Sequence, residues 1–151
     1  MQRDGRNGLY RVVLLYREEN FDAALEAFRT SLGVTDFGKP YVPAGVGLRI
    51  AISWESGLEL ITPHGDEGYA GPIRQHLAAK GEGMFGLIYR VGDIGEAERR
   101  AAAAGYPRQG ERIDCFEGNP TWRERFDRAD EARLAPIAGI DVTLIQLDPK
   151  Q

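Results

Sequence analysis

An internal repeat constrains the fold of this chain more strongly than any other feature of its sequence. In residues 82–106 an apolar run is followed by Gly92 and Asp93 and then by an Ala-rich run that ends at Gly105. This order is typical of a strand, a capped turn and a helix closed by glycine. Residues 9–33 show the same order. A repeated unit of this size must be recognised before the rest of the fold is interpreted.

The two copies align position by position. When Tyr16 is laid on Val91, Arg11 falls on Gly86, and both copies continue into a hairpin-like stretch that ends in a short strand. Those closing strands are Leu-Glu-Leu-Ile at 58–61 and Val-Thr-Leu-Ile at 142–145. The pattern predicts an α+β fold made of two βαβββ modules.

We place module one at about residues 9–70 and module two at about residues 84–147, within a single domain of residues 1–151. The first eight residues are polar and are expected to be frayed. Strands are predicted at residues 9–16, 48–54, 58–62, 84–91, 108–116 and 140–147, and helices at residues 22–32, 72–80 and 94–104. Asp93 is expected to cap the helix that follows it, because Glu96 stands at the capping-box spacing.

The composition is that of an ordinary soluble globular protein, with 42% hydrophobic and 28% charged residues. A formal net charge of −4 argues against a nucleic-acid partner. No apolar run approaches the roughly 18 residues that span a bilayer, so no membrane partner is expected. Cys115 is the only cysteine, which excludes an intrachain disulfide and is consistent with a cytoplasmic location.

Two charged residues interrupt apolar strands. Arg11 shares one face of its predicted strand with Val13 and Leu15, and Glu59 stands between two leucines. A carboxylate in mid-strand either faces solvent on an antiparallel sheet or is held in a cavity for a purpose. The residue pattern alone leaves both interpretations open.

Residues 117–131 have the least regular pattern of the chain. Arg123, Arg125 and Arg128 alternate with acidic residues and follow Trp122. This stretch is either a solvated face of mixed charge or a rim whose arginines and Trp122 contact an anionic or aromatic ligand. The two histidines have no ligand-like spacing and are expected to be surface residues rather than metal ligands.

Three segments, taken in order, carry a resemblance to a known family. They are Asn-Phe-Asp-Ala-Ala at 20–24, Leu-Glu-Leu-Ile-Thr-Pro at 58–63, and Gly-Pro-Ile-Arg-Gln-His-Leu at 71–77. The third segment is followed by Gly-Glu-Gly at 81–83 and then by a predicted strand and turn that end at residue 94. The chain resembles the vicinal oxygen chelate (VOC) superfamily, which includes glyoxalase I, bleomycin-resistance proteins and extradiol dioxygenases. Within it, the chain is most similar to the methylmalonyl-CoA epimerase branch. The resemblance covers nearly the whole chain except about residues 110–130.

The resemblance implies that the two modules close into a half-barrel whose concave side holds the ligand. Relatives usually bind a divalent metal there, through one residue from the first strand and one from the last strand of each module. In this chain those positions are Arg11, Glu59, Gly86 and Thr143. Only Glu59 is an ordinary metal ligand, and an arginine, always protonated, repels a metal ion at close range. We therefore expect neither a metal nor another cofactor.

Arg11 and Glu59 are expected to pair in the place of the metal, since either charge buried alone would cost several kcal/mol. Three roles for the pair stay open. In the first, the protein is a metal-independent epimerase, isomerase or lyase in which Glu59 takes a proton next to a carbonyl and Arg11 stabilises the oxyanion. In the second, it is a non-catalytic ligand-binding or sequestering protein of the bleomycin-resistance type. In the third, the pair is structural and the cavity is filled by the protein's own side chains.

The ligand would be a small molecule, and the arginines near residue 122 suit an anionic or CoA-linked one. Its expected contacts are Trp54, Phe85, Tyr89, Trp122 and Thr143. A homodimer is also expected, because a half-barrel module exposes sheet edges that need covering and VOC relatives commonly pair their modules.

Overall fold

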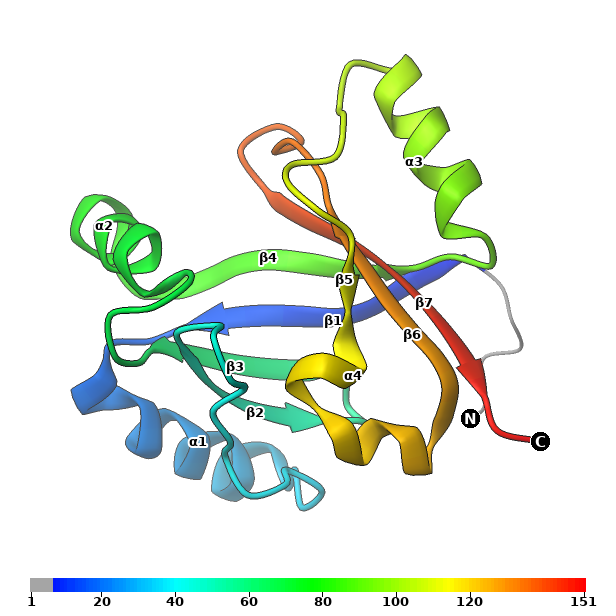
Figure 1. Cartoon of the computed structure of the whole chain (residues 1–151). Coiled ribbons are helices and arrows are strands. Elements are labelled where there is room, and N and C mark those ends of the chain that lie inside the picture. The colour runs from blue at the N-terminus through cyan, green and yellow to red at the C-terminus, as the bar shows by residue number, and fades with distance from the viewer. Residues whose placement is uncertain (1–6) are drawn as a thin grey trace. The chain divides into compact units, whose positions relative to one another are not determined.

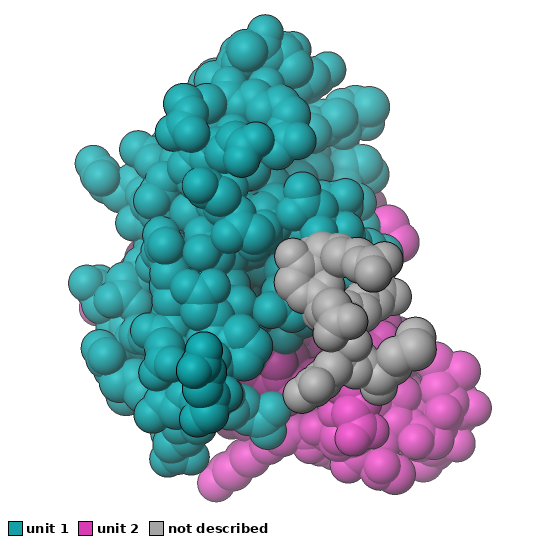
Figure 2. Space-filling view, turned by 90° about the vertical axis from the view of Figure 1, so that its right-hand side faces the viewer, with its two compact units in different colours: residues 1–10, 86–151 teal, residues 11–85 magenta. Residues whose placement is uncertain are grey.

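The computed structural model describes residues 7–151 (Figure 1). Residues 1–6, most of the segment expected to be frayed, lie outside the described residues. The chain separates into two compact units, shown in different colours in Figure 2: unit 1 contains residues 1–10 and 86–151, and unit 2 contains residues 11–85. Each boundary falls inside a strand of the repeat, so each unit holds most of one copy.

Unit 2 contains three strands and two helices. In chain order they are β1 (Gly8–Leu15, from residue 11 on), α1 (Glu18–Leu32), β2 (Leu48–Ser53), β3 (Leu58–Pro63) and α2 (Ala70–Lys80). The strand β3 lies between the other two, antiparallel to β2 and parallel to β1. The β2–β3 connection is a tight turn, as the sequence predicted.

Helix α1 covers one face of this sheet (Figure 1). Leu60 of β3 packs there with Phe21 and Leu25 of the helix, and all three side chains are buried. Because side chains alternate along a strand, Glu59 lies on the opposite face, and the same alternation along β1 places Arg11 there as well. The packing of α1 therefore decides which face carries the two charges.

The start of α1 is fixed by a residue far away in sequence. The helix has no side-chain cap of its own, but the Glu82 carboxylate accepts hydrogen bonds from the Arg17 backbone N–H at 2.9 Å and from Asn20 Nδ2 at 3.1 Å. These bonds lower the pKa of Glu82. Glu82 thus binds the residues at the start of α1, which begins about one turn earlier than predicted. Nothing in the local sequence indicates this contact.

Unit 1 contains the second copy of the repeat. In chain order its elements are β4 (Gly83–Arg90, from residue 86 on), α3 (Ile94–Ala103), β5 (Ile113–Asp114), α4 (Cys115–Gly118), the 3₁₀ helix η1 (Pro120–Glu124), β6 (Phe126–Arg133) and β7 (Asp141–Pro149). The strand β7 is parallel to β4 and antiparallel to β6. As predicted, Asp93 caps α3 by accepting a hydrogen bond from the Glu96 backbone N–H at 2.9 Å. None of the described helices has the length and hydropathy to cross a membrane.

The predicted alignment of the repeat is confirmed by backbone hydrogen bonds. The N–H of Tyr16 donates to the carbonyl of Ile61 at 3.0 Å, and the aligned Val91 donates to Ile145 at 2.9 Å. The first and last strands of each copy are thus joined in the same parallel register. Corresponding residues of the two copies can therefore be compared position by position.

Module one departs from the βαβββ pattern after its helix. Among the described residues, the place of the first of the three closing strands is taken by an isolated bridge in which Tyr41 and Ile50 exchange backbone hydrogen bonds of 3.0 and 2.9 Å. Pro40 and Pro43 flank this bridge. Pro43 lacks the N–H that the next ladder bond on its side would need, and on the other side a single hydrogen bond of 3.4 Å follows, from the Gly38 N–H to the Ile52 carbonyl.

Residues 108–133 are the part of the fold that the sequence pattern predicted worst. The predicted strand at 108–116 is wrong over most of its length, because only a bridge at Arg108 and the two residues of β5 pair before α4 begins. Residues 126–131 were assigned to the irregular charged stretch, but they belong to β6, which pairs with β7 over almost its whole length. Their sequence has no β-branched residue, so this pairing rather than intrinsic propensity orders the strand.

Candidate functional site

Arg11 and Glu59 form a buried ion pair in unit 2, on the sheet face opposite α1. The Arg11 Nε and Glu59 Oε2 atoms are 3.0 Å apart. The two residues are 2% and 8% exposed, respectively. The expected pairing is confirmed, and a solvent-facing Glu59 is excluded.

The surroundings of Glu59 favour its neutral form. Its neighbours across the sheet are Val13 on β1 and Ile52 on β2, both buried and apolar. Burial raises the pKa of the Glu59 carboxyl above its ordinary value, and the Arg11 guanidinium opposes that rise. Within the described part of the chain, Glu59 Oε2 accepts no hydrogen bond of good geometry. This oxygen therefore has capacity to take a proton.

Trp54 also contacts the guanidinium of Arg11. The Cζ atom of Arg11 is 5.4 Å from the centroid of the indole ring, a cation–π distance. Trp54 directly follows β2 and begins the turn to β3, so the turn brings it to the strand that carries Arg11. Unit 2 thus assembles three of the predicted site residues: a carboxylate, a guanidinium and an aromatic ring.

The sequence interpretation missed the residues that hold this turn. The Asp36 carboxylate accepts hydrogen bonds from Ser53 Oγ and, at 2.8 Å, from the backbone N–H of Glu55. Ser53 is fully buried. The hydrogen bond joins residues that are 17 positions apart, and no motif links them, so only the fold reveals this arrangement.

The remaining predicted contacts are distributed over both units. In unit 2, Phe85 packs edge-to-face against His76 with the ring centroids 5.0 Å apart. In unit 1, Trp122 is buried and faces Phe126 at 6.4 Å. Tyr89 and Thr143 lie on opposite faces of the unit 1 sheet. Tyr89 pairs with Leu144, whose side chain packs on α3, and Thr143 is the residue before Leu144, so its side chain points to the other face.

Two of the three arginines expected at a ligand rim contact residues of unit 1 instead. The guanidinium of Arg123 lies 4.5 Å from the ring centroid of Phe116. Arg128 Nε donates to Asp130 at 2.6 Å. These contacts favour the interpretation of this stretch as a face of mixed charge.

Of the four positions that the resemblance assigned to a metal, three carry residues that are poor ligands. Arg11 carries a positive charge, and Gly86 has no side chain. A Cβ atom at Gly86 would stand 2.4 Å from the carbonyl oxygen of Asp141, so β4 and β7 leave no room for a donor at that position. Thr143 offers only a neutral hydroxyl, and the described residues contain no group of three or more His, Cys, Asp or Glu that could hold an ion.

We expect elemental analysis of the purified protein to find no stoichiometric divalent metal. A chelator is also expected to leave the melting temperature unchanged, because no folded site would lose a ligand set. A content of about one Zn, Ni, Co, Mn or Fe ion per chain would contradict this prediction.

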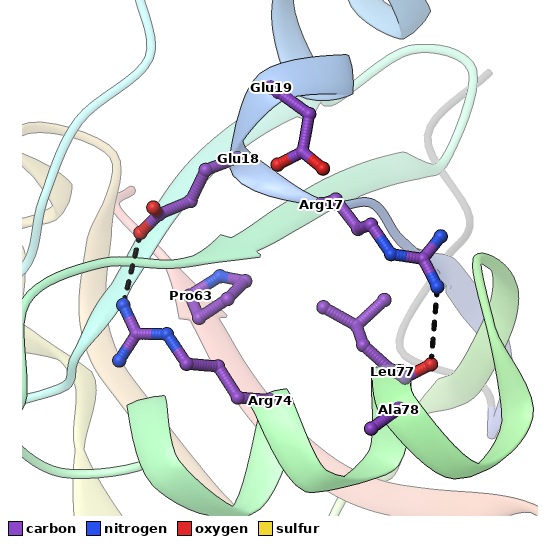
Figure 3. Close-up of a pocket in the computed structure, with 7 residues that line it drawn as sticks. All are labelled: Arg17, Glu18, Glu19, Pro63, Arg74, Leu77 and Ala78. Carbon is purple, nitrogen blue, oxygen red and sulfur yellow. Dashed lines mark hydrogen bonds and ion pairs between the residues drawn. The ribbon is translucent and has the colours of Figure 1, made fainter.

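An open pocket of about 240 Å³ lies elsewhere in unit 2, between the start of α1 and α2 (Figure 3). Arg74 Nη2 donates to Glu18 at 3.1 Å, and Arg17 Nη2 donates to the carbonyl of Leu77 at 3.4 Å. The two arginine side chains are 41% and 43% exposed. Both cations already have partners, and none of the predicted site residues lines this pocket.

The fold has close counterparts among solved structures. The hypothetical protein BH1468 from Bacillus halodurans C-125 has a TM-score of 0.74 at 20% identity, covering 96% of this chain and 97% of that one. Methylmalonyl-CoA epimerase from Mycobacterium tuberculosis has a TM-score of 0.69 at 20% identity, covering 92% and 87%. A methylmalonyl-CoA epimerase in complex with methylmalonyl-CoA and NH4+ has a TM-score of 0.66 at 17% identity, covering 93% and 94%.

No family model and no curated protein sequence matches the chain. The similarity to solved structures therefore establishes the fold and leaves the activity to be argued from the site. The α+β class predicted from the repeat is confirmed, and so is the resemblance that the ordered segments suggested. The chain has the fold of the VOC superfamily, and its structural neighbours include methylmalonyl-CoA epimerases.

Proposed function

We propose that this protein is a metal-independent, epimerase-like isomerase that acts on a small carbonyl compound, anionic or CoA-linked. The observation that carries the proposal is the buried Arg11–Glu59 pair, in which a carboxylate of raised pKa lies 3.0 Å from a fixed cation. A general base works best when its pKa lies near the working pH, and burial moves Glu59 in that direction.

The proposed step transfers one proton. The Glu59 carboxylate takes the proton from the carbon next to the carbonyl, the C–H electron pair moves toward that carbonyl, and an enolate oxygen gains the negative charge. Arg11 then faces the enolate instead of the carboxylate. Before the transfer the anion beside the guanidinium is the Glu59 carboxylate, and after the transfer it is the enolate. The negative charge therefore has a cation beside it in the buried site throughout the step.

The choice of ligand class has support from two directions. Structures among the neighbours were solved with methylmalonyl-CoA and with 2-nitronate-propionyl-CoA, so acyl-CoA thioesters are the first compounds to test. Trp54, which is half-buried beside the pair, offers an apolar surface to an acyl group. A cytoplasmic location is part of the same proposal, since a single cysteine cannot form an intrachain disulfide.

A non-catalytic binding protein is the second candidate. The observation in its favour is that Glu59 already contacts Arg11, so the carboxylate is partly neutralised without any reaction. In that case a ligand would bind beside Trp54 and no proton would move. The two candidates differ in one measurable property, which is exchange of the α-proton.

The test is exchange of the α-proton of methylmalonyl-CoA and propionyl-CoA in deuterated water, followed by NMR. The isomerase proposal expects enzyme-dependent exchange with at least one thioester. A rise in melting temperature with the thioester but no exchange supports the binding protein instead. Neither exchange nor a rise in melting temperature with either thioester would remove the CoA-linked ligand from the proposal.

We also propose that the protein is a homodimer, as expected from the exposed edges of its modules. In unit 2 the outer edge of β2 forms no further ladder, and its described backbone hydrogen bonds there are those of the Tyr41 bridge and one of 3.4 Å from the Gly38 N–H to the Ile52 carbonyl. Light scattering at tens of micromolar should give about twice the mass of one chain. The mass of a single chain at that concentration would contradict the proposal.

A further inference from the structure

We propose that Asp36 is a positioning residue, which holds the turn between β2 and β3 so that Trp54 keeps the Arg11 guanidinium on Glu59. Its effect on turnover rests on the function proposed above. Its effect on the position of Arg11 does not, and the two can be measured separately.

The turn at residues 54–57 is anchored at several atoms. Asp36 Oδ1 accepts from Ser53 Oγ, and Asp36 Oδ2 accepts from the Glu55 backbone N–H at 2.8 Å. Ser53 Oγ in turn accepts from Ser56 Oγ at 2.5 Å and from the Ser56 backbone N–H at 3.1 Å. One carboxylate therefore organises both sides of the turn through a chain of hydrogen bonds.

The other end of the turn is tied to the strand that carries Arg11. The carbonyl of Gly57 accepts a hydrogen bond of 2.8 Å from the backbone N–H of Val12. Gly57 has φ of 71°, which glycine adopts without strain. With the turn fixed at Asp36 and at Val12, the indole of Trp54 has little freedom to leave the guanidinium.

The position of Trp54 matters because an arginine side chain is long and flexible. The guanidinium has two contacts that restrain it: Arg11 Nε lies 3.0 Å from Glu59 Oε2, and Arg11 Cζ lies 5.4 Å from the centroid of the Trp54 indole. If the turn loosens, the aromatic side of this arrangement is lost, and the guanidinium gains rotamers that move it away from Glu59. Asp36 binds the turn at Ser53 and Glu55 and thereby acts on Arg11 through Trp54.

The experiment compares Asp36→Ala with Asp22→Asn in the full chain, using NMR signals of the Arg11 Nε–H and the Trp54 indole N–H. Arg11→Lys and Trp54→Phe assign the two signals. Asp22 is a matched control, because it is an acidic residue of the same unit whose exposed ion pair with Arg49 lies outside the network. Asp36→Ala is expected to speed exchange of the Arg11 Nε–H with water about tenfold and to shift the Trp54 signal. Asp22→Asn is expected to change neither.

Two milder variants cover the case in which Asp36→Ala does not fold. Asp36→Asn keeps one acceptor oxygen, and Ser56→Ala removes only the outer hydroxyl, so each should shift the Trp54 signal in the same direction by a smaller amount. Unchanged Arg11 and Trp54 signals in the Asp36 variants, or equal changes in Asp22→Asn, would overturn the proposal. If the Asp36 variants behave as expected but the parent protein exchanges no α-proton, the positioning role stands and the isomerase function fails.

Discussion

Replacing Arg11 with methionine is expected to lower the free energy of unfolding by on the order of 3 kcal/mol at pH 7 to 8, and by much less near pH 5. Methionine keeps the apolar stem, so the loss comes from leaving the Glu59 carboxylate buried without its counter-charge. The pKa of Glu59 is already raised by burial, and removing the guanidinium that opposes this raises it further.

The pH dependence follows from the direction of that shift. A carboxyl whose folded-state pKa lies above its unfolded value binds more protons in the folded chain, so stability falls as pH rises from the unfolded pKa through the folded one. The decrease in the free energy of unfolding caused by Arg11→Met should therefore be small when Glu59 is protonated and reach its full size when Glu59 is ionised. The pH window begins near the ordinary glutamate pKa of about 4.3 and extends upward.

Denaturant unfolding between pH 4.5 and 8 measures this effect. Arg29→Met is a suitable control, because its guanidinium is 3.9 Å from Glu26 and 37% exposed, and an exposed pair contributes about 0 to 1 kcal/mol. An Arg11→Met protein as stable as the parent across this range would show that water reaches the pair. The proposed site would then be wrong.

Glu59→Gln is expected to slow α-proton exchange by about 10²- to 10⁴-fold, the usual contribution of a general base. The amide keeps the shape of the carboxylate and accepts a hydrogen bond from Arg11, but it does not take the proton. The fold should suffer less than in Arg11→Met, because Arg11 keeps its contact with the Trp54 ring. Ligand-dependent stabilisation should therefore survive while exchange is lost.

The matched control is Glu55→Gln, which changes an exposed carboxylate in the neighbouring turn. Its exchange rate should equal that of the parent. Exchange at the parental rate in Glu59→Gln would assign the base to another residue. Loss of both exchange and ligand-dependent stabilisation would instead make Glu59 a binding residue.

The repeat made the central part of the fold predictable. Its strands are apolar, its helices carry their own stop signals, and aligned positions such as Tyr16 and Val91 make equivalent hydrogen bonds. The pairing of Arg11 and Glu59 was expected from the resemblance to the VOC superfamily, which assigns both residues to one site. The residue pattern alone left open whether Glu59 faces solvent, because alternation along a strand does not tell which face is covered.

Features that depend on distant contacts were not predictable in this way. The strand β6 is ordered by pairing with β7, and its own residues favour no strand. Asp36 reaches the Trp54 turn only after the chain folds back, and its sequence context is that of an ordinary loop. Local patterns report propensity and periodicity, whereas these contacts arise from tertiary structure.

The contact between Glu82 and the start of α1 has a consequence for how the protein is made. The helix is complete at residue 32, but the carboxylate that binds Arg17 and Asn20 at its start belongs to Glu82. A ribosome synthesises the chain from the N-terminus, so α1 leaves the exit tunnel long before Glu82 does. During that interval the Arg17 backbone N–H and the Asn20 side-chain amide do not have this carboxylate as an acceptor, and unit 2 reaches its final form only after α2 and the turn beyond it have emerged.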